Sequence, residues 1–128
     1  MTLQRVASLA SVVLAAGALV SRHEAVPSAQ APVTFSDHVA PILFANCTSC
    51  HRPGEAAPFA LMSYRDARPL AKAIASATAA HAMPPWKAGP SDYPFANARQ
   101  LSADQIATIQ KWVADGALEG DPSRLPAL

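Results

Sequence analysis

Residues 47–51 read Cys47-Thr48-Ser49-Cys50-His51, and their two cysteines are the only ones in the chain. The thiols are three positions apart, so a single turn of backbone can carry both, and a histidine directly follows the second. Such a group can tether a cofactor, bind a metal ion or form a reactive thiol pair. The rest of the sequence decides among these three.

Two of the interpretations lack support elsewhere in the chain. A structural zinc site needs two further ligands at suitable spacing, whereas His38 and His81 are single and far apart. Redox-active CxxC motifs sit in a βαβ context, and no strand alternation is visible here. A disulfide between cysteines so close in sequence would constrain little of the unfolded chain.

The remaining interpretation is the CxxCH signature of covalent c-type haem attachment. Each thiol adds across one vinyl group to form a thioether, and two intervening residues make the turn that spans both positions. The adjacent histidine is then held beneath the iron as an axial ligand. The motif therefore predicts one covalent haem c, attached through Cys47 and Cys50, with His51 as an iron ligand.

The composition agrees with a fold built around a large apolar group. Of 128 residues, 29 are alanine, and only four Phe, two Trp and two Tyr supply bulk. A protein core made from these side chains alone is thin, and small domains usually need an additional staple. Ten Lys and Arg balance nine Asp and Glu, which argues against nucleic acid as a partner.

The first 31 residues are interpreted as a signal peptide or N-terminal anchor. Residues 6–20 form an uncharged, mainly apolar run, shorter than the roughly 20 apolar residues of a transmembrane helix. Residues 29–31 have the small-x-small form of a cleavage site, although Pro32 is a poor neighbour for it. We expect a periplasmic or otherwise exported domain over residues 32–128, anchored to a membrane only if residues 6–20 are retained.

Two helical segments are predicted on either side of the motif loop. The first covers Phe35 to Asn46, after the capping-box-like pair Thr34 and Asp37. The second runs over residues 63–80, with an acid three residues after its start, and Pro69 divides it into a short turn and a longer helix. Its alanines would let another group approach closely.

A third predicted helix has the clearest ends. Ser102 and Gln105 form a capping box, and Gly116 is placed for a C-cap. Trp112 is expected to pack this helix against the first one, near Phe35. The expected buried stripe consists of Ile106, Ile109 and Val113.

Residues 33–121 resemble a class I-type monohaem cytochrome c domain. More narrowly, they resemble a bacterial cytochrome c-like family through TFSDHVAPIL, CTSCHRPGEAAPF, SYRDARPL, MPPW and LSADQIATIQKWVADGALEGDP. The resemblance implies an all-α, cytochrome c-like fold of three to five short helices wrapped around one covalently bound haem. Some members of that family are fused to, or found beside, copper-dependent monooxygenase-like or redoxin-like modules.

The second axial ligand is expected in the loop after the second helix. Met83 is favoured because Pro84 and Pro85 stiffen the backbone beside it, and the family resemblance also implies a loop methionine here. His81 is the rival, and imidazole there would give a lower reduction potential than thioether sulfur. An open position is a third option. Met62 is expected to fill a gap in the core.

Other expectations concern the surroundings of the haem. The carbonyl of Pro53 is a candidate to accept a hydrogen bond from the second ring nitrogen of His51. Trp86 and Tyr93 are candidates to cover the haem edge, whereas Phe95 is expected to pack in the core. The arginines that are candidate propionate partners are Arg52, Arg65, Arg68 and Arg99.

Together these features predict an electron carrier and not an enzyme. A His/Met-ligated iron would cycle between ferrous and ferric states, with a redox protein as donor, another as acceptor, and c-type haem attachment machinery as a maturation partner. Two alternatives stay open. One is a haem protein with an open or displaceable sixth site, either a small-ligand sensor or a peroxidase-like enzyme. The other is an electron-entry subunit of a larger oxidoreductase.

Overall fold

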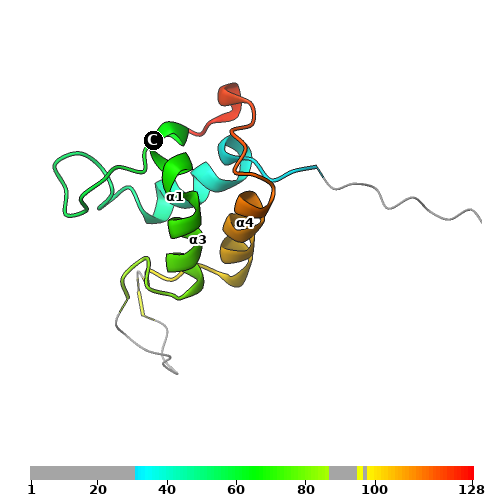
Figure 1. Cartoon of the computed structure of the whole chain (residues 1–128). Helices are drawn as coiled ribbons and strands as arrows, with labels where there is room; N and C mark the ends of the chain where they lie inside the picture. Colours follow the sequence, from blue (N-terminus) through cyan, green and yellow to red (C-terminus); the bar gives the residue numbers. More distant parts are fainter. Residues whose placement is uncertain (1–30, 87–94, 97) are drawn as a thin grey trace, which may run out of the picture.

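A computed structural model describes residues 31–86, 95–96 and 98–128 of the chain. Only the last residue of the predicted leader, residues 1–31, belongs to the described part. Tyr93 lies outside it, within residues 87–94. The elements in chain order are η1 (Phe35–Val39), α1 (Ala40–Asn46), α2 (Tyr64–Ala67), η2 (Arg68–Leu70), α3 (Ala71–Ala79), α4 (Ala103–Ala114) and η3 (Pro122–Arg124) (Figure 1).

The described residues are mostly helical, as expected for an all-α domain. Their β pairing is limited to one parallel bridge, which joins Thr34 to Leu118. The helices α3 and α4 lie side by side, and η1 packs against α4 (Figure 1). Within the described ranges, no helix has the length and apolar character needed to cross a membrane.

The first predicted helix is present, but it begins as a π-helical turn, η1, before α1. Pro41 falls in the first turn of α1, directly after η1. The expected cap from Thr34 and Asp37 is wrong. The Thr34 hydroxyl donates to the Asp37 carboxylate at 3.0 Å, so it does not cap the helix backbone.

The second predicted segment divides at Pro69, as expected. Ser63 caps α2 by accepting a hydrogen bond from the backbone N–H of Asp66, at 3.2 Å. Pro69 then lies in the short 3-10 turn η2, and α3 follows directly. Because a proline is tolerated in a first helical turn, Pro69 fits this position directly before α3.

Both predicted ends of α4 are confirmed. The Ser102 hydroxyl accepts from the Gln105 N–H at 3.2 Å, and the Gln105 side chain accepts from the Ser102 N–H at 2.9 Å. At the other end Gly116, with φ +95°, follows the C-cap. Its N–H donates to the Val113 carbonyl, and the next N–H donates to the Trp112 carbonyl. These two bonds form a Schellman motif, which requires the positive φ that glycine allows.

The buried stripe of α4 differs from the prediction. Ile109 and Trp112 are fully buried, whereas Ile106 and Val113 are only partly buried. The sequence period identified the apolar face, but the direction in which η1 and α3 approach decided which residues lie at its centre.

Phe35 is the centre of the aromatic core and is fully buried. Its ring centroid lies 6.0 Å from that of Trp112, 5.7 Å from Tyr64 and 6.5 Å from Phe44. These separations and tilted geometries are typical of favourable aromatic pairs. The expected contact between Trp112 and Phe35 is therefore confirmed.

The segment after α4 is fastened to the rest of the core by hydrogen bonds. The Leu118 carbonyl accepts from the Phe35 backbone N–H at 2.8 Å and from Trp112 Nε1 at 2.9 Å. The Ala117 carbonyl accepts from the Tyr64 hydroxyl at 3.0 Å. The same aromatic residues that build the core therefore also hold the chain end against it.

Replacing Phe35 with alanine should lower the free energy of unfolding by about 3–5 kcal/mol, because it empties a fully buried site between four elements. Urea denaturation of the two proteins measures the loss. Phe95, which is 51% exposed, is the control. Its replacement by alanine should change the free energy of unfolding by no more than about 0.5 kcal/mol. Equal losses at the two positions would contradict this description of the core.

Asp115 should make the stability depend on acid. Its pKa lies below the ordinary value of 3.8, because Lys111 donates to its carboxylate and the Val33 backbone N–H does so at 2.7 Å. A lowered folded-state pKa stabilises the protein above the unfolded-state pKa, and this contribution is lost as pH falls through the folded-state pKa. The free-energy difference between wild type and Asp115→Asn should be largest near neutral pH and shrink below about pH 4. A difference independent of pH, measured by urea denaturation at several pH values, would refute this.

Candidate functional site

An apolar cavity of about 570 Å³ lies between the end of α1, the following loop and α3. This volume is within the range of roughly 300–1,000 Å³ that is common for cofactor and small-molecule sites. Its wall includes Leu61, Leu70 and Ile74, together with the small side chains of Ala73 and Ala77. The cavity exists because alanines stand where larger side chains would fill the space.

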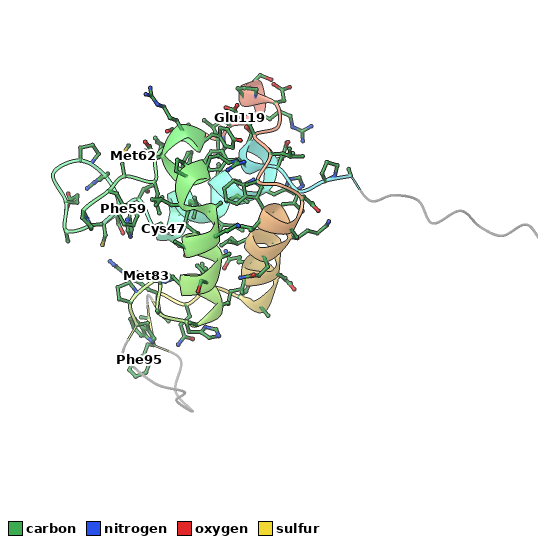
Figure 2. All side chains as sticks on the ribbon, in the orientation of Figure 1. Cys47, Phe59, Met62, Met83, Phe95 and Glu119 are labelled. Carbon is green, nitrogen blue, oxygen red and sulfur yellow. The ribbon has the colours of Figure 1, made fainter. Side chains whose placement is uncertain are left out.

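The structure brings all four predicted site residues to this cavity. Cys47, Cys50 and His51 line it from the end of α1, and Met83 lines it from the segment after α3. Figure 2 shows Cys47 and Met83 on the same side of α3. His81 is exposed, with φ +53° at the end of α3, and does not line the cavity. The rival for the second ligand position is therefore placed elsewhere.

The CxxCH stretch itself forms a single turn that continues from α1. The Cys47 N–H donates to the Leu43 carbonyl at 2.8 Å. The Cys47 carbonyl accepts from the backbone N–H groups of Cys50 at 3.1 Å and His51 at 2.9 Å. Because these bonds close one turn, both thiols and the imidazole are held at the same part of the cavity wall.

The Cys47 thiol lies in an environment that disfavours its ionised form. Burial, and secondarily the neighbouring Cys50, raise the pKa of Cys47 to about 11. A thiol with this pKa is protonated at neutral pH, whereas reactive and redox-active cysteines have lowered values. Among the residues that the structure describes, no group of three or more His, Cys, Asp or Glu side chains is arranged to hold a metal ion.

The loop after the motif turns back through a type II turn, which the sequence interpretation missed. Pro53 and Gly54 occupy the central positions, Gly54 has φ +83°, and the Glu55 N–H donates to the Arg52 carbonyl at 3.2 Å. Proline followed by glycine is the sequence signal for this turn, because only the second central position needs a positive φ. The signal was present in the residues that follow the motif.

This loop supplies the hydrogen-bond partner of His51. His51 Nδ1 lies 3.2 Å from the carbonyl oxygen of Phe59, so the expectation that Pro53 would supply the carbonyl is wrong. The turn directs the residues after Pro53 away from His51 before the chain returns. Since a carbonyl only accepts, Nδ1 carries the proton in this contact, and the Nε2 lone pair is left free for a metal.

The buried polar side chain of α3 that lines the cavity, Thr78, already has a hydrogen-bond partner. Thr78 is buried, and its hydroxyl donates to the Ile74 carbonyl at 2.8 Å within the same helix. The polar side chains of Asn46 and Arg99 also line the cavity, and Asn46 Nδ2 donates to the Ile42 carbonyl at 2.9 Å. The face of α3 that meets the cavity is therefore apolar in its chemistry.

Met83 lies in the segment after α3, beyond the helix C-cap Ala80. Its backbone N–H and that of Ala82 both donate to the Ala77 carbonyl, at 3.2 and 2.9 Å, which fixes the start of the segment against the helix. The Met83 side chain is 43% exposed at the cavity. Met62, the other candidate considered from sequence, is partly buried and does not line the cavity.

The remaining sequence-based expectations divide. Trp86 and Phe95 contact each other edge to face at 5.9 Å, but Phe95 is 51% exposed, so its expected core position is wrong. Of the four candidate arginines, Arg99 lines the cavity, and Arg52 pairs with Glu55 at 3.0 Å. Arg65 and Arg68 do not line it.

Comparisons of this chain with protein-family models, with curated proteins and with solved structures found no match.

Proposed function

We propose that this chain is an exported, monohaem c-type cytochrome that carries single electrons between redox proteins. The observation that supports this most directly is the shared cavity: one apolar space of cofactor size is lined by both cysteines of the CxxCH motif, by His51 and by Met83. Haem c would be tethered by Cys47 and Cys50 and ligated by His51 and Met83. When bound, its iron supplies the exchange of one electron between ferrous and ferric states.

The chain's own contribution begins with His51. The hydrogen bond from Nδ1 to the Phe59 carbonyl selects one tautomer and restrains the rotation of the imidazole. Such bonds to the outer nitrogen orient a ligating histidine and raise its basicity. A ligand held in one orientation needs little rearrangement when the charge of its metal changes.

The apolar wall makes a second contribution. Leu61, Leu70 and Ile74 provide hydrocarbon contact, and the alanines of α3 allow a flat group to approach the helix. An apolar environment disfavours the form of a redox centre that carries the larger net charge, and axial-ligand identity and burial both set its potential. Thioether sulfur from Met83 as the second axial ligand would raise the reduction potential relative to imidazole, which suits an electron carrier.

One observation favours a second candidate function. Met83 lies in a loop segment beyond the end of α3 and not in a helix. A displaceable methionine would open the sixth position to a small ligand and turn the protein into a sensor or a peroxidase-like enzyme. The two functions share the tether and His51, and they differ in whether Met83 stays bound.

The covalent tether can be tested by mass. When the full chain is produced with c-type haem attachment machinery, the denatured protein should retain one haem, because thioethers survive unfolding. The double variant Cys47→Ala/Cys50→Ala should retain none. Ser49→Ala changes an exposed residue between the cysteines and should leave the attached mass unchanged. A wild-type protein without the added mass of haem would refute the proposed function.

The role of Met83 can be tested by redox titration of Met83→Ala against Met62→Ala. Loss of a thioether ligand should lower the reduction potential by a sizeable part of the roughly 0.8 V range that axial ligands span. Met62 does not line the cavity, so its replacement should leave the potential near that of wild type. An unchanged potential in Met83→Ala would exclude Met83 as a ligand.

Carbon monoxide distinguishes the two candidate functions in the same samples. The visible spectrum of the reduced wild-type protein should not change on addition of carbon monoxide if Met83 stays bound, whereas that of Met83→Ala should change. A wild-type spectrum that responds as readily as that of the variant would favour the sensor or peroxidase-like alternative.

A further inference from the structure

We infer that Phe59 is a positioning residue for His51: its aromatic ring packs against the imidazole, shields it and restrains its orientation. The inference deepens the proposed function and rests on it, because it takes His51 as an iron ligand. It assigns a role to the side chain of Phe59, in addition to that of its backbone carbonyl, which accepts a hydrogen bond from the imidazole.

The two rings are in direct contact. Their centroids are 4.6 Å apart and their planes are inclined by 39°, which is within the range of favourable aromatic packing. The Phe59 carbonyl lies 3.2 Å from His51 Nδ1, so one residue contacts the imidazole through both its ring and its backbone. A single hydrogen bond allows the imidazole to pivot about it, whereas a second contact on the ring face opposes that rotation.

The backbone fixes Phe59 in this position. The Ala57 N–H donates to the Cys50 carbonyl at 3.2 Å, and the Leu61 N–H donates to the His51 carbonyl at 2.9 Å. These bonds lie on either side of Phe59 in sequence, and both lead back to the CxxCH turn. Leu61 is buried, which anchors the returning end of the loop in the core. The position of the ring is therefore determined by the main chain on both sides.

The hydrogen bond needs protection because it lies at the protein surface. The loop residues from Arg52 to Ala56 are exposed, and His51 itself is only partly buried. Water competes for an exposed N–H, and a hydrogen bond that opens readily restrains its donor poorly. Phe59 is 43% exposed and lines the cavity beside His51. Its ring packs on the imidazole, next to this hydrogen bond.

The test is the rate at which the His51 Nδ1 proton exchanges with water, measured by proton–nitrogen NMR on the full chain in its reduced form. In Phe59→Ala the carbonyl remains but the ring is lost, and we expect exchange to be about tenfold faster or more. Phe59→Tyr keeps the ring and should restore the wild-type rate. A role limited to the backbone, or to general stability, would not distinguish alanine from tyrosine in this way.

Phe95→Ala provides the matched control. Phe95 is another exposed aromatic residue, at 51%, and it contacts Trp86. Its replacement should leave the His51 exchange rate unchanged. The inference is overturned if Phe59→Ala exchanges within about twofold of wild type, or if Phe95→Ala accelerates exchange as much. The mass of each sample is measured first. A wild-type sample without haem overturns the proposed function and this inference with it. A haem-containing sample whose exchange rate is the same in Phe59→Ala and wild type overturns the inference alone.

Discussion

Phe35 packs its ring on Trp112 and Tyr64 where the first helical segment, the α2 turn and the last helix meet. The placement of the helices that border the cavity depends on this contact. It fixes η1 and α1 relative to α4, and α4 in turn holds α3, where Gln110 Nε2 donates to the Ala75 carbonyl at 2.7 Å. The CxxCH turn after α1 and the alanine-rich face of α3 are thereby held on the same cavity, although they belong to different segments of the chain.

The placement of small and large side chains follows from this arrangement. The aromatic side chains of Phe44, Tyr64 and Trp112 gather around Phe35, whereas the small side chains of Ala73 and Ala77 border the cavity. Protein interiors are normally close-packed, and unfilled apolar volume is destabilising. Under the proposed function, the haem supplies the missing contacts, so the same group that exchanges electrons also completes the core.

The loop after the motif shows how a local turn acts on a distant side chain. The Pro53–Gly54 turn reverses the chain just after His51. The returning part of the loop is bonded to the motif, because the Leu61 N–H donates to the His51 carbonyl. Because of this reversal, Phe59 contacts a histidine eight positions earlier through both its ring and its carbonyl. The geometry of His51 is therefore set by the loop as much as by the helix before it.

The sequence by itself determined the elements whose signals are local. The CxxCH motif, the capping box of Ser102, the glycine after α4 and the break at Pro69 depend on neighbouring residues, so each could be predicted without knowledge of the fold. The proline–glycine turn was equally local and was overlooked. Cytochrome-like function was also inferred at this level, and it stays a proposal.

Only the tertiary structure decided which residues meet across the chain. The two prolines after Met83 favoured it from sequence, but only the fold shows that Met83 lines the cavity and that Met62 and His81 do not. Only the fold likewise shows that the Phe59 carbonyl, and not that of Pro53, contacts His51. It also shows that Phe95 is exposed and that Ile109 and Trp112 lie at the centre of the buried α4 face. These outcomes depend on how helices approach one another and where loops return, because burial and long-range contact are properties of the packed chain.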